Sequence, residues 1–541
     1  MPEEAREDSL LFGLLVHFRQ FCCGSSAATL PFMGHEGGRT VLFNSWHFAA
    51  FMAVLVPLYY LPFATVQWQV NLLLIASGVF YAWEDPRLLV LLVASSGFSV
   101  FATQQVARHA AHAPGDSDDR AHRSATAAWW LFVGVAVNLA ALLLFKYASL
   151  LSELAPSWLV PASANEWAAH IPLPVGISFY TFQGISLVVD AWRGDLTPQT
   201  KASLTAKGLG RLVSFRDATF YLLFFPQLVA GPIVKAHDFL PQICRKTRRD
   251  IDWLVARRAL ITGFFLKMVV ADNLSEQTVP LTLGTAGTMS MGSLNLASLI
   301  YAYSLQIFAD FAGYSLIAIG LSALFGYRLS PNFNFPYLAT SITDFWRRWH
   351  ISLSSWLKEY LYIPLGGNRL GDLRTYINLF VVMFLGGLWH GAAWKYALWG
   401  SLHGLFLAAE RLMNRFAPAR RPGSHGLSLA SILPLLKWFV TFHLVTLLWL
   451  TFVMPDLGSI QKCLHSLAFG AIGQPGTPAF ALLFYGMPVV LYHAWGYLHE
   501  HRRRMATRLL DSWAEPLVHG LMLFGIVTNA GAPRGFIYFQ F

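Results

Sequence analysis

Long stretches without aspartate, glutamate, lysine or arginine recur along almost the whole chain. A helix needs about 20 mostly apolar residues to cross a hydrocarbon core of about 30 Å, so such stretches favour membrane-spanning helices. They occupy the following ranges: Val41–Trp83, Leu88–Ala107, Ser124–Phe145, Trp167–Val189, Ala218–Val234, Gln277–Ala309, Phe311–Tyr327, Thr375–Trp394, Tyr396–Ala409, Trp438–Pro455, Cys463–His499 and Pro516–Pro533. The sequence therefore predicts an all-α polytopic membrane protein with about ten to twelve transmembrane helices.

The composition excludes a soluble enzyme and a disordered chain. Charged residues make up 13% of the 541 residues, whereas about 25% is usual for a soluble domain. The net charge of +10 does not indicate a nucleic-acid partner, because the basic residues form short clusters between apolar stretches. Membrane lipid is the expected surrounding. Four cysteines, Cys22, Cys23, Cys244 and Cys463, form neither a disulfide framework nor a metal-ligand spacing, so no metal is expected.

Two apolar runs are interrupted by proline and glycine, namely Leu173–Phe182 and Phe224–Pro232. They indicate partial or re-entrant helices. Irregular backbone at membrane depth persists only where protein or a water-filled cavity satisfies its polar groups, so these breaks predict an internal cavity. Residues 1–40 differ from the rest, and they can be read as an interfacial amphipathic segment or as a plain chain terminus.

The segment Thr343–Arg369 is too charged to cross lipid and too aromatic for a solvated loop. At helical spacing, one face carries Trp346, Trp349, Leu353, Trp356, Leu357 and Tyr360, and another carries Arg347, Ser354 and Lys358. An amphipathic helix lying in the membrane interface, with His350 near its middle, satisfies both faces. The simpler interpretation is an aromatic anchor at the membrane surface.

His390 lies in the glycine-rich end of the charge-free stretch Thr375–Trp394, between Gly387 and Gly391. Glycines leave room for a close approach to its ring. A titratable residue inside a membrane segment is a functional candidate. The chain has 18 histidines, however, and by spacing alone a histidine such as His390 is more often a packed, hydrogen-bonded residue.

Asp310 interrupts the apolar run Gln277–Tyr327 close to Tyr314. A carboxylate in such surroundings requires a partner or a proton. A transporter could use it as a proton site, and an enzyme could use it to orient a histidine. The sequence leaves both possibilities open.

Taken together, these segments resemble the membrane-bound O-acyltransferases, and within them the alginate O-acetyltransferase branch of bacterial polysaccharide acetylases. The resemblance covers residues 41–541, and residues 1–40 form an extension outside it. It is carried by the motifs LPVGISFYTFQGISLVVDAWRGD at Leu173–Asp195, FFPQLVAGPIVKAHDFLPQI at Phe224–Ile243, GFFLKMVVADNL at Gly263–Leu274, DFAGYSLIAIGLSALFGY at Asp310–Tyr327, NFNFPYLATSITDFWRRWHISLSSWLKEYLYIPLGGNR at Asn332–Arg369, GGLWHGAAWKYALWGSLHG at Gly386–Gly404 and FIYFQF at Phe536–Phe541.

The resemblance implies a fold in which transmembrane, re-entrant and interfacial helices surround a central tunnel. It implies two catalytic histidines, His350 in WHISLS and His390 in LWHG, with His390 as the principal one. Asp310, Tyr314 and Trp389 are further candidates for lining the tunnel or orienting the site. An apolar environment disfavours the charged imidazole, so a neutral His390 could act as the general base.

The resemblance also implies the reaction. Acetyl-CoA is the expected acyl donor, and the acetyl group would cross the bacterial inner membrane for O-acetylation of an exported polysaccharide, alginate-type in the first place. The chain has no G-x-S-x-G elbow, so a periplasmic partner, an SGNH-type serine-esterase-like acetyltransferase, is expected to complete the transfer. The alternatives are a D-alanyl or peptidoglycan acyl exporter of the same family, and a transporter of a lipid-linked substrate or glycan.

Clusters of lysine and arginine predict the orientation, because such residues are enriched in short cytoplasmic loops. The densest clusters are Arg245–Arg249 with Arg257 and Arg258, Arg411–Arg421, and Arg502–Arg508. Tags inserted at Arg248, Arg420 and Arg503 should therefore all report the cytoplasm in a reporter-fusion assay. A periplasmic signal from any one of them would contradict the charge-based orientation.

Overall fold

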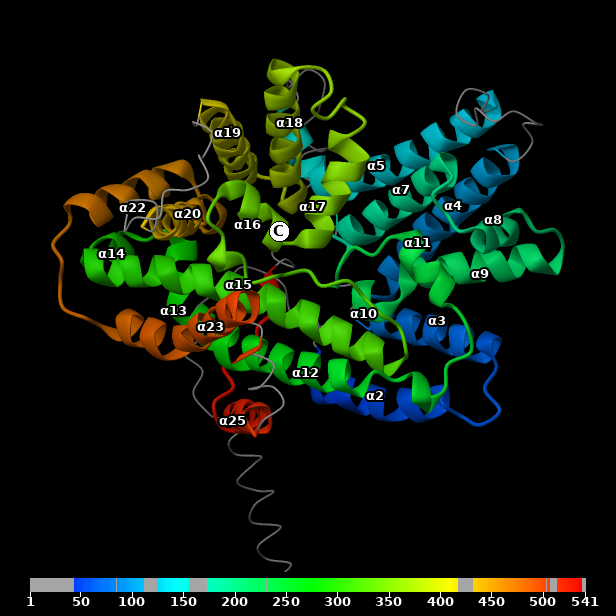
Figure 1. Cartoon of the computed structure of the whole chain (residues 1–541), viewed down its shortest axis with the longest axis horizontal. Coiled ribbons are helices and arrows are strands. Elements are labelled where there is room, and N and C mark those ends of the chain that lie inside the picture. Colours follow the sequence, from blue (N-terminus) through cyan, green and yellow to red (C-terminus); the bar gives the residue numbers. More distant parts are fainter. Residues whose placement is uncertain are drawn as a thin grey trace, which may run out of the picture. The chain divides into compact units, whose positions relative to one another are not determined.

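The computed structural model describes residues 43–83, 85–110, 124–154, 171, 173–228, 231–416, 432–502, 504–505 and 513–537. All regular structure in these ranges is helical (Figure 1). Residues 1–40, Arg420 and Arg503 lie outside them. The helices are α2 (Trp46–Tyr59), α3 (Val66–Ala82), α4 (Pro86–Ala110), α5 (Ala125–Leu154), α7 (Ile177–Arg193), α8 (Pro198–Thr205), α9 (Leu209–Leu223), α10 (Phe225–Leu228), α11 (Ala236–Phe239), α12 (Trp253–Phe264), α13 (Asp272–Leu283), α14 (Ala286–Met289), α15 (Ser293–Leu324), α16 (Ile342–Arg348), α17 (Ile351–Leu357), α18 (Asp372–His390), α19 (Trp394–Phe416), α20 (Leu433–Leu448), α21 (Leu450–Val453), α22 (Leu457–Phe469), α23 (Thr477–His501) and α25 (Ala514–Thr528).

Five helical segments in the described ranges are long and apolar enough to cross a membrane. They are α4, α5, α15, the run Leu433–Val453 and α23, and three shorter apolar helices are α2, α3 and α25. The chain is thus all-α, as the sequence predicts. The expected ten to twelve spans stay a prediction.

Helix α15 is the longest and is buried along most of its length. It packs along α12, α13 and the π-helical turn Phe265–Ala271 that joins them (Figure 1). Helices α12 and α15 approach closely at Gly263, where a Cβ atom would lie 2.9 Å from the carbonyl oxygen of Gly313. The sequence divides this region at Asp310, but α15 continues through that residue without a break.

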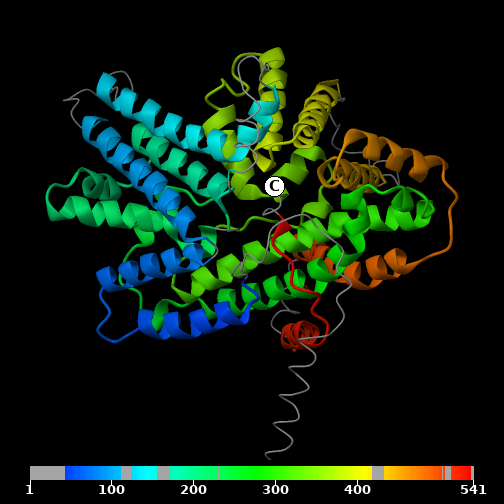
Figure 2. The same cartoon turned by 180° about the vertical axis from the view of Figure 1, so that it is seen from behind.

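Helices α4, α5 and α7 lie side by side in both views (Figures 1 and 2). Helix α7 begins after Gly176, whose φ of +73° is left-handed, and it continues to Arg193. The run Leu173–Phe182 therefore contains the start of a longer helix, and its proline and its glycine lie before that helix. Whether this helix is re-entrant stays a prediction. The run Phe224–Pro232 does contain a short helix, α10.

Helices α18 and α19 form an antiparallel hairpin whose turn, Gly391–Ala393, carries His390 at its edge. A Cβ atom on Gly387 would lie 2.9 Å from the Cα atom of Gly400. A Cβ atom on Gly391 would meet the ring of Tyr396. These glycines therefore allow the two helices to touch, and the space expected beside His390 is filled by α19.

The segment Thr343–Arg369 is not the single helix that the sequence predicts. Helix α16 ends at Arg348, α17 begins at Ile351, and a π-helical turn, Lys358–Tyr362, follows. The break falls at His350, whose φ is +43°. The predicted faces survive the break: Trp349, Leu353, Trp356 and Leu357 are buried, and Arg347 and Lys358 are exposed. Its position at the membrane surface stays a prediction.

Gly387→Ala should destabilise the protein by about 1–3 kcal/mol, because the added methyl group would push against the backbone of α19. Gly78→Ala is the matched control, since a Cβ atom there has no other atom within 4 Å. The detergent-solubilised variants are heated to a series of temperatures, and size-exclusion chromatography measures the fraction that stays folded at each. Equal melting temperatures for the two variants would contradict close packing of α18 on α19.

Candidate active site

His390 is the last residue of α18, and its side chain is buried among aromatic rings. The centroid of its imidazole lies 5.1 Å from the ring of Trp389, 5.2 Å from Trp399 and 5.4 Å from Phe452. These rings come from α18, α19 and α21. The surroundings are therefore apolar on several sides, as the sequence predicts for this stretch.

Two consecutive residues of α5 contact the end of α18. Lys146 Nζ donates hydrogen bonds to the carbonyl oxygens of Trp389 at 2.6 Å and His390 at 3.1 Å. Tyr147 Oη donates to the carbonyl oxygen of Leu388 at 2.7 Å. The last carbonyl groups of a helix lack partners within the helix, so α5 supplies donors at the residue that bears the imidazole.

His350 precedes the first residue of α17 and is fully buried. Its left-handed backbone is held from both sides by residues 332–334. The amide of Ile351 donates to the carbonyl oxygen of Asn332 at 2.9 Å, and the amide of Asn334 donates to that of Arg348 at 2.9 Å. A non-glycine residue in this conformation is strained and persists only where its surroundings fix it.

The side chain of Asn332 determines which nitrogen of His350 carries the proton. Asn332 Oδ1 lies 3.1 Å from His350 Nδ1 and accepts hydrogen bonds from the amide and the hydroxyl of Ser352, at 3.3 and 2.8 Å. A backbone amide can only donate, so the atom facing it is the amide oxygen. His350 Nδ1 must then donate to the same oxygen, which leaves Nε2 as an acceptor.

The structure brings His350 and His390 into contact with the same indole, that of Trp389. The centroid of the His350 ring lies 6.0 Å from Trp389, and the His390 ring lies 5.1 Å from it. Trp389 Nε1 and His350 Nε2 are buried and have no hydrogen-bond partner among the described residues. These two buried polar atoms are therefore candidates for contacts with a substrate.

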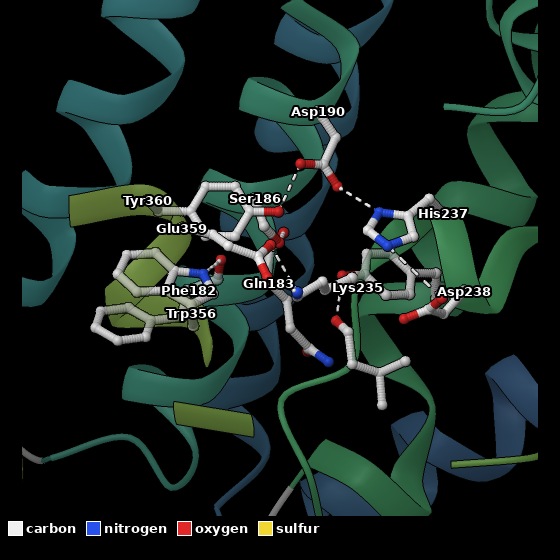
Figure 3. Close-up of polar contacts among 12 residues, drawn as sticks. Phe182, Gln183, Ser186, Asp190, Lys235, His237, Asp238, Trp356, Glu359 and Tyr360 are labelled. Atoms are coloured by element: carbon white, nitrogen blue, oxygen red, sulfur yellow. Dashed lines mark hydrogen bonds and ion pairs between the residues drawn. The ribbon is translucent and has the colours of Figure 1, made fainter. Parts of the chain in front are cut away.

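Helix α17, which follows His350, and the π-helical turn after it contact α7 (Figure 3). The indole of Trp356 stacks on Phe182 with centroids 3.8 Å apart. Tyr360 Oη donates to Asp190 at 2.5 Å. Lys235 forms an ion pair with Glu359, and His237 Nδ1 lies within hydrogen-bond distance of Asp190, at 3.3 Å. His350 is thus placed by a helix that is fixed at both ends.

Asp310 and Tyr314 belong to a separate buried cluster. Asp310 Oδ1 lies 2.8 Å from Lys267 Nζ, which also lies 2.6 Å from Asp272. Asp310 Oδ2 accepts the amide hydrogen of Ile537 at 2.8 Å. Lys267 also lies over the ring of Tyr314, at 5.3 Å. The carboxylate therefore has a cationic partner, and it anchors the C-terminal segment instead of orienting a histidine.

A polar cavity of about 720 Å³ lies at the other end of α18 from His390. Acidic and basic side chains both line it, namely Asp344, Arg347, Asp372, Glu410, Arg411 and Arg415. In the described part of the chain, no group of three or more histidine, cysteine or acidic side chains is placed to hold a metal ion.

Sequence reasoning missed Lys146, Tyr147 and Asn332. Lys146 directly follows the charge-free stretch Ser124–Phe145, where a lysine is usually read as a boundary residue. Asn332 opens the quoted motif NFNFP, but nothing in its spacing relates it to His350. Only the fold shows which backbone atoms these side chains reach.

A model of the membrane-bound O-acyltransferase family matches residues 168–454, a range that includes both histidines. Among curated proteins, "Probable alginate O-acetylase AlgI" of Pseudomonas aeruginosa is 38% identical over 75% of this chain and 71% of its own length. "Peptidoglycan O-acetyltransferase" of Helicobacter pylori is 33% identical over 75% of this chain and 74% of its own. "Teichoic acid D-alanyltransferase" of Bacillus subtilis is 27% identical over 50% and 66%, respectively.

Lys267→Met should destabilise the protein by about 3–5 kcal/mol, because it leaves two carboxylates buried without a cation. Lys462→Met, at an exposed position, is the control. Melting temperatures of the purified variants measure the effect. If Lys267→Met had the same melting temperature as the control but no activity, the cluster would take part in the reaction and would not stabilise the fold.

Proposed function

Because this chain belongs to the membrane-bound O-acyltransferase family, we propose that it takes acetyl groups from cytoplasmic acetyl-CoA and passes them across the bacterial inner membrane for O-acetylation of an exported polysaccharide. The observation that carries this proposal is the pair of buried motif histidines at one indole. The names of the relatives at 38% and 33% identity support acetyl as the transferred group. The first of them supports an alginate-type polysaccharide.

We assign the central proton transfer to His390. An acceptor hydroxyl is a weak nucleophile, and a base within hydrogen-bond reach typically accelerates its attack by about 10²–10⁴-fold. The hydroxyl proton passes to the imidazole of His390 as the oxygen bonds to the acetyl carbon. The carbon–sulfur bond breaks, and the imidazole returns the proton to the sulfur of CoA. The base is neutral again at the end of the cycle.

Two other groups complete the proposed site. The indole N–H of Trp389 has no acceptor among the described residues, so it can donate to the oxygen of the thioester as negative charge develops there. Asn332 holds Nε2 of His350 as an acceptor for an N–H or O–H group of a substrate. Both groups are buried, where hydrogen bonds are stronger than in water.

The acetyl group, and not CoA, would cross about 30 Å of hydrocarbon. On the outer side, a serine-esterase-like acetyltransferase is the proposed receiver, since the sequence contains no G-x-S-x-G elbow. On the cytoplasmic side, Arg411 and Arg415 line the polar cavity and could attract the phosphates of CoA. The more common role of such basic clusters is to determine topology beside anionic lipid.

The second candidate function is a transporter of a lipid-linked substrate or glycan, and one experiment separates the two. Purified protein is incubated with acetyl-CoA labelled in the acetyl group, a serine-esterase-like acetyltransferase and an acceptor glycan. An acyltransferase releases free CoA and labels an acceptor, whereas a transporter leaves the thioester intact. Ion pairing of Asp310 with Lys267 removes one argument for the transporter, because that carboxylate already has its partner.

His390→Ala should abolish acetyl transfer in a protein that still folds and inserts. Loss of a general base predicts a fall of about 10²–10⁴-fold in kcat. His443→Ala is the control, because His443 lies in α20, where its Nδ1 is hydrogen-bonded to the carbonyl oxygen of Phe439 in its own helix turn. If His390→Ala kept more than about a tenth of the wild-type rate, the assignment of the base would be wrong.

A further inference from the structure

Lys146 directs its ammonium group into the protein and not toward a membrane surface. Its Nζ atom lies 2.6 Å from the carbonyl oxygen of Trp389, 3.1 Å from that of His390 and 3.2 Å from Oγ of Ser178. An ammonium group has three hydrogens. All of them are therefore used by acceptors of α18 and α7, and none is left for a substrate.

Three successive carbonyl groups at the end of α18 receive donors from α5. Tyr147 Oη donates to Leu388, and Lys146 donates to Trp389 and His390. A cation at a helix C-terminus also interacts favourably with the helix dipole. The interaction is stronger away from water, and unpaired carbonyl groups would be costly there.

We propose that Lys146 is a positioning residue for the reaction: its ammonium fixes the last turn of α18 and so holds the imidazole of His390 at the reaction centre. The proposal rests on the proposed function, because it assigns a role relative to the same histidine. Lys146 does not touch the substrates. Its removal should change the rate of the chemical step and leave the binding of the acyl donor nearly unchanged.

The ordinary reading of Lys146 is a lysine whose charged end extends to the membrane surface. Three contacts within hydrogen-bond distance oppose it, because a solvated ammonium would not need them. Its Nζ atom also lies 5.7 Å from the centre of the Trp389 ring. Both the backbone and the indole next to His390 are therefore in contact with one side chain.

A graded series of variants tests the proposal. Lys146→Met removes every donor and should lower kcat by at least about ten-fold, the loss expected for hydrogen bonds to a charged group. Lys146→Gln and Lys146→Arg keep N–H donors and should recover part of that rate. The KM for acetyl-CoA should stay within about two-fold of the wild-type value throughout, since no substrate contact is lost.

Lys395→Met is the matched control. Lys395 also donates to a backbone carbonyl oxygen, that of Met454 at 3.2 Å, and it lies over the ring of Tyr396 at 5.1 Å. It is close to His390 in the sequence but does not bind the end of α18. The kcat of Lys395→Met should stay within about two-fold of the wild-type value, because the contact of Lys146 with the end of α18 is intact.

Three results would overturn the proposal: an unchanged kcat in Lys146→Met, a raised KM with an unchanged kcat, or an equal loss in Lys395→Met. Thermal melting of each variant is measured alongside the kinetics. If the wild type itself released no CoA, the proposed function would fail. The melting temperatures would then be the remaining test of whether Lys146 fixes α18. A melting temperature of Lys146→Met no lower than that of Lys395→Met would refute this placement.

Discussion

A helix that ends inside a membrane protein must find donors for its last carbonyl groups, and this requirement determines the geometry of the site. In α18 the donors come from Lys146 and Tyr147 of α5. The same helix end carries His390. Gly387 and Gly400 allow α19 to pack directly against α18. The end of α18 is therefore in contact with α5 and with α19. The imidazole is therefore fixed through its backbone before any substrate is present.

The second histidine is placed by the same principle. His350 stands at the junction between α16 and α17, and the backbone and side chain of Asn332 hold its left-handed conformation and its tautomer. Contacts of Trp356 and Tyr360 with α7 fix the other end of that helix. Both histidines thus lie at helix ends and not on helix faces. Such positions can be held rigidly while both rings pack against the indole of Trp389.

Much of this architecture could be predicted from the sequence, because charge-free stretches and motif histidines are local features. The buried face of Thr343–Arg369 follows from helical spacing, whereas the break at His350 depends on Asn332, a residue outside that segment. The partner of Asp310 is Lys267, which lies on another helix and has no spacing signal. Lys146 looks like a boundary lysine because its sequence neighbours are apolar on one side only. Tertiary contacts decide these cases.

The most direct test of the account is the sidedness of the reaction in proteoliposomes that contain the purified protein. Acetyl-CoA labelled in the acetyl group is supplied on the face that carries Arg248, and an acceptor glycan with a serine-esterase-like acetyltransferase is supplied on the other face. The account predicts that CoA is released on the first face and that labelled acetyl esters form on the second, both depending on His390. Label that stays on the thioester, or intact acetyl-CoA that crosses the membrane, would contradict it.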